Sequence, residues 1–495
     1  MTSGEKRWGG GKSAGHKRAD FRRSGSVSVL LTCLLAGVVS VFSLLYNAAS
    51  FRTLQSAVEW NAANAGRAVL TYYIPELFQE YGICAMWNET ELIESRMEEF
   101  VRENSPFWRP ASQTGLLRAE EGEATIKTEQ HSLMSAEEMQ KQIYRVMEYG
   151  AAFSMLQESE FISSMRELFA LVQEGVWAQE QQEAEDMPAR GDAVQFASVR
   201  SATAQNSESA EEEQRRLLRR LRREADKREE KGKKLLDEIP EEGGNALTDP
   251  QRIAALPSRK QEQRLPQRSW RQLCTGGMQS LQEVLSFAYV DLYAVQHFGN
   301  YRDRRDSWFD CELEYILHGK LSDRENIRKT KTELFFLRTL LNLAAICKEG
   351  ELRRTVSAMA TAAAPIPYPV AFGLISSSLC AGEAGGDVKK LMEGSRLPVL
   401  KTAGNFRMLG GQDEERESAF TLSYETHLQL LLLLRGQETK IVRMMDLIQL
   451  NMSRHFGEEF ILEDCCTGFD WQLTAVLKNS VGREKGWSCD GISHY

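Results

Sequence analysis

The sequence has few cysteines, and they are not arranged for disulfide pairing. The nine cysteines are scattered, their number is odd, and no CxxC pair occurs. This spacing excludes a regular disulfide framework and favours buried, small apolar side chains. The adjacent residues Cys465 and Cys466 leave a reactive pair as an alternative.

The sequence also lacks the short motifs that mark common catalytic sites. It contains no GxxxxGK[ST] and no HExxH string, and its seven histidines are far apart. The GxSxG string at residues 11–15 lies in a polar stretch with no strand directly before it and no helix directly after it. A nucleophile elbow needs both, so we interpret the string as a chance match. We therefore predict no enzyme activity, no catalytic, cofactor-binding or metal-binding residues, and no cofactor.

Charge is absent from one long stretch, residues 26–51 (SVSVLLTCLLAGVVSVFSLLYNAASF). At about 1.5 Å per residue, a helix of this length exceeds the ~30 Å hydrocarbon core of a bilayer. A cleaved signal peptide is the alternative, but its apolar region is shorter, about 7–15 residues. We predict a retained transmembrane helix that continues into a juxtamembrane helix. The apolar face of the latter recurs every three or four residues from Leu54 to Tyr73, and Pro75 marks its break.

Basic residues dominate the segment before this span, with seven Lys and Arg against two acidic residues. Short basic flanks of this kind stay in the cytoplasm. We therefore expect the N-terminus on the cytoplasmic side of the cell membrane and the bulk of the chain on the outer side. The basic tail suits membrane lipid as a partner, and the net charge of −9 gives no reason to expect nucleic acid. Ala36, Gly37 and Ser40 offer a face for close helix approach and hence for a homo-oligomer.

Composition divides the chain into segments, and the expected fold class is α+β, mostly helical, with a two-part extracytoplasmic domain. We expect a basic cytoplasmic tail at 1–25, the span at 26–51, the juxtamembrane helix and first ectodomain part at 52–177, a charged insert at 178–268, a C-terminal α+β ectodomain at 269–478, and a frayed tail at 479–495. The insert is too polar to bury a core, so we expect it to be largely disordered around one solvated helix at 211–238. A partner-binding or coiled-coil segment is the alternative there.

Several shorter elements follow from local patterns. Residues 103–134 are polar and poor in pattern. Alternation predicts a strand at 311–317 (CELEYIL) and a strand or hairpin at 460–477. Ser322 followed by Glu325 predicts a capping box at the start of a helix.

Two acidic residues, Glu383 and Asp387, are four positions apart in the sequence. They form a carboxylate pair that could carry out acid–base chemistry. Three neighbouring glycines (Gly382, Gly385 and Gly386) argue against a well-formed helix there. We therefore interpret the pair as capping a helix that starts near Asp387 and as forming a salt bridge to a lysine: Lys389, Lys390 or Lys401. Five polar residues on otherwise apolar helices are interpreted as buried pairs that fix helix packing: Arg338, Asn342, Arg443, Asp446 and Asn451.

Seven strings in order give the sequence a family resemblance: RSGSVSV (23–29), LFQEYGI (77–83), QIYRVMEY (142–149), EYILHG (314–319), DVKKLMEG (387–394), LSYE (422–425) and RMMDLIQLN (443–451). Together with Asn326, Arg338 and Asn342, they resemble a bacterial family of unknown function found beside Tad (Flp) pilus genes in Gram-positive anaerobes, and TadE/TadG-like proteins. The resemblance covers most of residues 24–477 except the charged insert.

The resemblance implies a membrane-anchored, pseudopilin-like structural or assembly component of a Tad/Flp-type pilus or related envelope system. Its implied partners are pilus subunits or Tad assembly proteins. Leu30 stands where a prepilin peptidase commonly expects Glu, so we expect no cleavage, and His427 also departs from the family pattern. A single-pass sensor or binding protein with an extracytoplasmic ligand domain is the alternative function, and a membrane-tethered hydrolase is the third.

Overall fold

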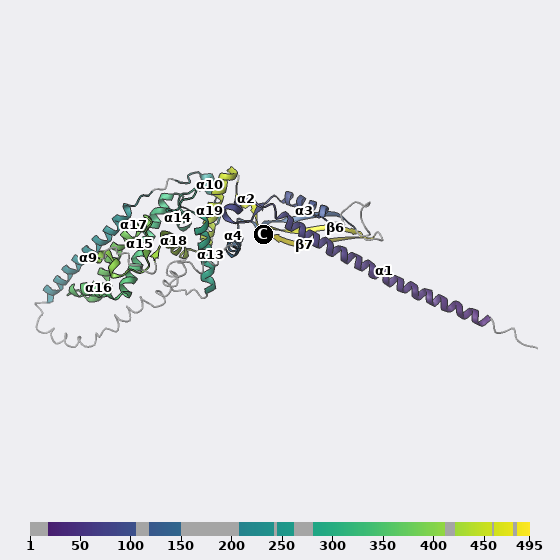
Figure 1. The fold of residues 1–495 in the computed structure, drawn as a ribbon, viewed down its shortest axis with the longest axis horizontal. Coiled ribbons are helices and arrows are strands. Elements are labelled where there is room, and N and C mark those ends of the chain that lie inside the picture. The colour runs from purple at the N-terminus through teal and green to yellow at the C-terminus, as the bar shows by residue number, and fades with distance from the viewer. Residues whose placement is uncertain are drawn as a thin grey trace, which may run out of the picture. The chain divides into compact units, whose positions relative to one another are not determined.

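The computed structural model describes residues 18–104, 118–149, 207–241, 245–261, 281–410, 421–457, 460–478 and 483–495. The chain forms two compact units, and each is built from separate stretches of sequence (Figure 1). Unit 1 comprises Met1–Tyr72, Asn88–Gln130 and Gly468–Tyr495, and unit 2 comprises Tyr73–Trp87 and His131–Thr467. The described parts of the charged insert, residues 207–241 and 245–261, belong to unit 2.

Unit 1 is organised around one long helix, α1 (Arg18–Val69). Its stretch Val27–Val69 is long and apolar enough to cross a membrane. Large apolar side chains between Val27 and Tyr46 are exposed, as expected of a segment that contacts lipid. Further along, one face is buried at the predicted spacing of three and four residues: Leu54, Val58, Ala62, Ala65 and Val69.

The buried face of α1 packs on α3 (Thr90–Asn104) and on an antiparallel sheet. The sheet has the order β2 (Arg118–Lys127), β6 (Gly468–Lys478), β7 (Glu484–His494). Asn61 Nδ2 donates to the carbonyl of Val101 at 3.0 Å, which ties α1 to α3. Gly66 lies so close to β7 that a Cβ there would be 2.3 Å from Ser493 Oγ.

Two strands of this sheet correct the sequence-based expectations. The segment expected to be a frayed tail contains β7, which pairs with β6 from Glu484 to His494. The segment expected to have no pattern contains β2, which carries a register shift between Glu120 and Glu123. Only a few side chains of each strand are buried, and most of the others are polar. The alternation of polar and apolar residues that marks a strand is therefore weak in both segments. The predicted strand within 460–477 is present as β6.

Unit 2 is mostly helical. Its helices are α2 (Pro75–Tyr81), α4 (Ala136–Tyr149), α9 (Ser207–Asp237), α10 (Pro250–Ala255), α11 (Pro257–Gln261), α13 (Leu281–His297), α14 (Glu312–His318), α15 (Asp323–Lys348), α16 (Gly350–Ala362), α17 (Tyr368–Met392), α18 (Tyr424–Leu433) and α19 (Gln437–Phe456). Two short antiparallel pairs complete it: β1 (Met86–Trp87) with β5 (Cys465–Cys466), and β3 (Leu397–Pro398) with β4 (Thr421–Leu422). The predicted α+β, mostly helical class is confirmed.

The predicted strand at 311–317 is wrong, because this segment forms α14. All its residues from Glu312 to Leu317 are buried, so their alternation does not reflect an exposed face and a covered face. Gly319 ends the helix in the left-handed conformation, with φ of 61°. The next helix, α15, begins after Ser322 as predicted, but the Ser322 hydroxyl makes no capping hydrogen bond.

The described part of the charged insert is also not a solvated helix. Helix α9 runs alongside α17 (Figure 1), and the two backbones touch at glycines. A Cβ on Gly385 would lie 2.1 Å from the carbonyl oxygen of Gly232. Three leucines of α9, Leu217, Leu218 and Leu221, pack against the hydrophobic cluster formed by α15, α16 and α17. The partner of α9 is thus another helix of the same chain. Residues 178–206 and 262–268 lie outside the described residues.

Candidate functional site

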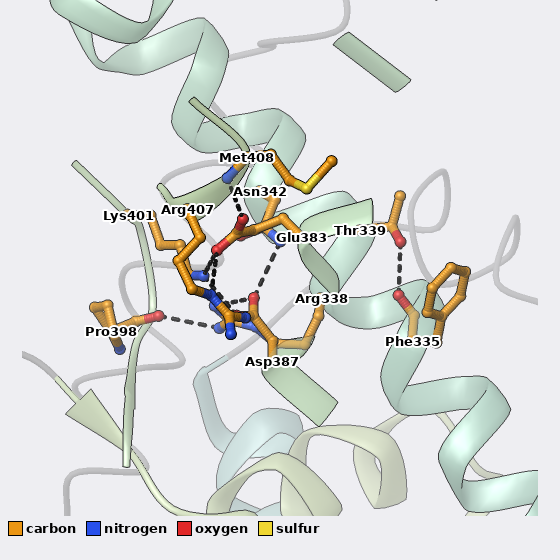
Figure 2. A network of polar contacts seen from close by, with 10 residues as sticks. All are labelled: Phe335, Arg338, Thr339, Asn342, Glu383, Asp387, Pro398, Lys401, Arg407 and Met408. Atoms are coloured by element: carbon orange, nitrogen blue, oxygen red, sulfur yellow. Dashed lines mark hydrogen bonds and ion pairs between the residues drawn. The ribbon is translucent and has the colours of Figure 1, made fainter. Parts of the chain in front are cut away.

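The carboxylate pair singled out in the sequence lies in a buried ionic network (Figure 2). Asp387, on α17, accepts hydrogen bonds at Oδ2 from Arg338 Nε at 3.2 Å, Arg338 Nη2 at 3.1 Å and Asn342 Nδ2 at 3.1 Å, all from α15. Its Oδ1 accepts from Lys401 Nζ at 2.5 Å. Both Arg338 and Asp387 have side chains that are 0% exposed.

Glu383 lies one turn earlier on α17 and shares the same cations. It pairs with Lys401, it accepts from Arg407 Nε at 3.4 Å, and its Oε2 accepts from the backbone N–H of Met408 at 2.9 Å. Arg338 also donates to the carbonyl of Pro398, in β3, at 3.0 Å. The network therefore joins α15, α17, β3 and the chain that follows β3.

The electrostatics of this network disfavour proton transfer. Burial by itself would raise the pKa of Asp387, but the charges of Arg338 and Lys401 outweigh burial and hold the pKa below its ordinary value. Each carboxylate has cationic partners, so neither is available as a general base. The predicted salt bridge to Lys401 is confirmed.

The predicted helix start near Asp387 is wrong, because α17 is continuous from Tyr368 to Met392. The glycines allow neighbouring groups to approach this regular helix closely. A Cβ on Gly386 would be 2.2 Å from Arg407 Nη2, and one on Gly385 would collide with α9. Glycine here gives room for a neighbouring backbone and a guanidinium group, at the expense of helix propensity.

The remaining polar candidates contact neighbouring segments; Asp446 and Asn451 are buried, as predicted, whereas Arg443 is only half-buried and lines a cavity. Asp446 accepts from Tyr315 Oη at 2.7 Å and from the Ser258 N–H at 2.8 Å, and burial raises its pKa to about 6. Asn451 donates to Glu312 Oε1 at 2.7 Å. Arg443 Nη1 donates to the carbonyls of Ile316 and Leu317, both at 2.8 Å, and so binds the last turn of α14.

Two further sequence candidates are buried. Cys465 and Cys466 lie in β5 with no exposed surface, and burial raises the pKa of the Cys465 thiol, which disfavours the reactive thiolate. His427 is 0% exposed, with Nδ1 at 2.7 Å from the Ser423 carbonyl. Burial and the charge of Arg338 lower the pKa of His427 to about 3, so its ring is neutral at physiological pH.

Sequence analysis did not predict the open cavity of unit 2, whose volume is about 1700 Å³. It lies where the end of α14, the first five turns of α15 and the α18–α19 junction meet. Basic residues line it: Arg259, Lys320, Arg328, Lys329, Arg435 and Arg443. Glu325 and Glu333 also line it, and Phe336 and Leu340 form part of an apolar wall. The one local sequence signal is the basic run RKTK at residues 328–331.

The cavity wall includes an uncharged histidine, His318, at the C-terminus of α14. Its Nε2 lies 2.9 Å from Thr330 Oγ1. Burial, followed by the charges of Arg435, Arg443, Lys329 and Lys320, lowers the pKa of His318 to about 3. Four cations thus act on one imidazole, which indicates a positive potential in the cavity.

Among the residues that the structure describes, no group of three or more His, Cys, Asp or Glu is placed to hold a metal ion. No curated protein and no solved structure is significantly similar to the chain. A family of unknown function, DUF5702, matches residues 223–476, a range that includes the ionic network and the whole cavity lining. Because this match covers slightly more than half of the sequence, the chain belongs to the DUF5702 family.

Proposed function

We propose that the protein is a membrane-anchored, pseudopilin-like structural or assembly component of a Tad/Flp-type pilus or a related envelope system. In this proposal the N-terminus is cytoplasmic, α1 crosses the cell membrane once, and the rest of the chain is extracytoplasmic. The proposed partners are pilus subunits or Tad assembly proteins.

The observation that carries the proposal is the continuity of α1. One unbroken helix runs from the apolar stretch after Val27 to Val69, and its second half is buried against α3 and the sheet of unit 1. A lipid-spanning helix that is built into a folded head is the geometry of pilins, although other anchored proteins share it. The head is thereby held at a fixed angle to its anchor, which suits a subunit that packs beside other subunits.

The ionic network is consistent with a non-catalytic role. Its two carboxylates pair with Arg338 and Lys401, and these four side chains are withdrawn from solvent, so they hold α15 and α17 in place. The order of sequence strings shared with the family beside Tad pilus genes adds independent support.

The test is a crosslinking pull-down of the full chain, extracted from the membrane of its native cell and read by mass spectrometry. Recovery of Tad pilins or assembly proteins is the expected result. A matched control replaces residues 26–51 with an unrelated apolar span of equal length, which preserves anchoring and removes the specific helix surface. Recovery of a signalling protein in place of pilus components would overturn the proposal.

A second candidate function, a single-pass sensor or binding protein, is favoured by the cavity in unit 2. Binding pockets commonly have volumes of roughly 300–1,000 Å³, so a hollow of about 1700 Å³ has room for a ligand. A thermal-shift screen of the detergent-solubilised full chain against charged and neutral small molecules tests this role. A saturable rise in Tm that is lost when Thr439, on the wall, is replaced by Trp would support it, and no rise with any compound class would count against it.

A further inference from the structure

We infer that the cavity of unit 2 binds the phosphate group of an organic phosphate, and this inference rests on the second candidate function. Six Lys and Arg side chains line the cavity against two carboxylates, in a chain whose net charge is −9. Cations gathered around a hollow of an acidic protein repel one another unless an anion lies between them.

The two acidic residues are too few to balance the six cations. Glu333 forms an ion pair with Arg435, and its Oε1 lies 3.8 Å from His318 Nδ1. Glu325 is exposed in the first turn of α15. Arg443 donates to the carbonyls at the end of α14 and also lines the cavity.

Lys320 and Lys329 repel each other, and the charges of Glu325 and Glu333 offset this repulsion only in part. Partial burial, and then the neighbouring ammonium group of Lys320, lower the pKa of Lys329. The same two lysines also help to keep His318 neutral. In both Lys329 and His318, nearby positive charges disfavour the protonated form and so lower the pKa. A bound phosphate would have the opposite effect on both pKa values.

Two further features of the cavity suit a phosphate ester. The N-terminus of α15 opens onto the cavity at Ser322, whose hydroxyl makes no capping bond, and helix N-termini favour anions. Phe336 is 61% exposed and Leu340 is 40% exposed on the same helix, so an apolar or ring-bearing part of the ligand has a surface to cover. The recognised chemistry is a phosphate next to an apolar group, and its source is either a soluble organic phosphate or a lipid headgroup.

The experiment is equilibrium dialysis of the full chain in a neutral detergent with radiolabelled pyrophosphate, and in a second arm with dihexanoyl phosphatidylglycerol. Saturable binding of either probe, weakened by rising NaCl, is the expected result. Binding of pyrophosphate alone indicates a soluble ligand, and binding of the lipid alone indicates a headgroup. If neither probe binds, the inference that the cavity binds phosphate is wrong. The broader proposal that the protein binds a ligand is tested separately, by the neutral compounds in the thermal-shift screen.

The variant Lys320→Gln/Lys329→Gln should bind whichever probe the native chain binds at least about tenfold more weakly, since two charge-assisted contacts are lost. The matched control Arg353→Gln/Arg354→Gln removes two exposed charges from α16, outside the cavity, and should bind as the native chain does. An unchanged Tm shows that each variant is folded. If the lysine variant is misfolded, Arg328→Gln at the rim takes its place. Equal affinity of the cavity variant and the control would overturn the inference.

Discussion

Arg338 and Asp387 face each other across α15 and α17 with both side chains fully withdrawn from solvent. Two nitrogens of the guanidinium group donate to one carboxylate oxygen, at 3.2 and 3.1 Å, while Lys401 holds the other oxygen. Buried ion pairs of this kind contribute little net stability against an apolar replacement, but the loss of one partner leaves a buried charge.

Replacing Asp387 with Asn should therefore destabilise unit 2 by about 3–5 kcal/mol, because Arg338 and Lys401 would remain charged and buried. The double variant Arg338→Met/Asp387→Leu should be less destabilised than Asp387→Asn. The measurement is the Tm of the detergent-solubilised chain by circular dichroism. The control Glu229→Gln breaks an exposed i,i+4 pair with Lys233 on α9 and should change stability by less than about 0.5 kcal/mol. Similar Tm values for Asp387→Asn and this control would contradict the buried network.

Gly385 of α17 is expected to tolerate no Cβ. Replacing it with Ala should destabilise the chain by about 1–3 kcal/mol, because the new carbon would lie 2.1 Å from the Gly232 carbonyl oxygen of α9. The control is Gly373→Ala on the same helix, where nothing lies within 4 Å and a gain of about 0.5–1 kcal/mol follows from helix propensity. Opposite signs of the two Tm shifts are expected, and a gain in both would show that α9 does not pack here.

His427 should make the fold sensitive to acid. Its pKa is 6.5 when unperturbed and about 3 in the folded chain. Between these values the unfolded chain binds a proton that the folded chain does not, so stability is lost as pH falls from about 6.5 toward 3, by up to about 1.4 kcal/mol per pH unit. In His427→Leu this contribution is absent. The difference in Tm between pH 8 and pH 5 should be smaller in this variant than in the native chain, and an equal difference would contradict the buried, neutral histidine.

The sequence predicted those features whose cause lies within one segment. The apolar face from Leu54 to Val69 follows from the helical period, and the span at 26–51 follows from the absence of charge. The salt bridge from Lys401 to the Glu383 and Asp387 pair was also expected, since a carboxylate pair on a largely apolar segment needs cations.

The sequence did not predict features whose cause is a contact between distant segments. Gly385 disfavours a helix when it is considered alone, yet it lies inside α17 because the Gly232 backbone of α9 fills the space. β7 is almost entirely polar, and it becomes a strand by pairing with β6 along its whole length. The cavity depends on several elements that meet only in the folded chain, so its cations have no common pattern in the sequence.

The small-residue face of the span offers the last test. Nothing lies within 4 Å of a Cβ placed on Gly37, and the Ser40 hydroxyl donates to the Ala36 carbonyl at 2.7 Å. The hydroxyl therefore needs no outside acceptor, and Gly37 lets a second helix approach closely. If the span self-associates through this face, Gly37→Ile should weaken association in bilayers by roughly 1 kcal/mol, about fivefold, as measured by energy transfer between labelled chains. Val38→Ile adds bulk on the opposite face and should leave association unchanged, whereas an equal loss in both variants would show that Ala36, Gly37 and Ser40 do not form the interface.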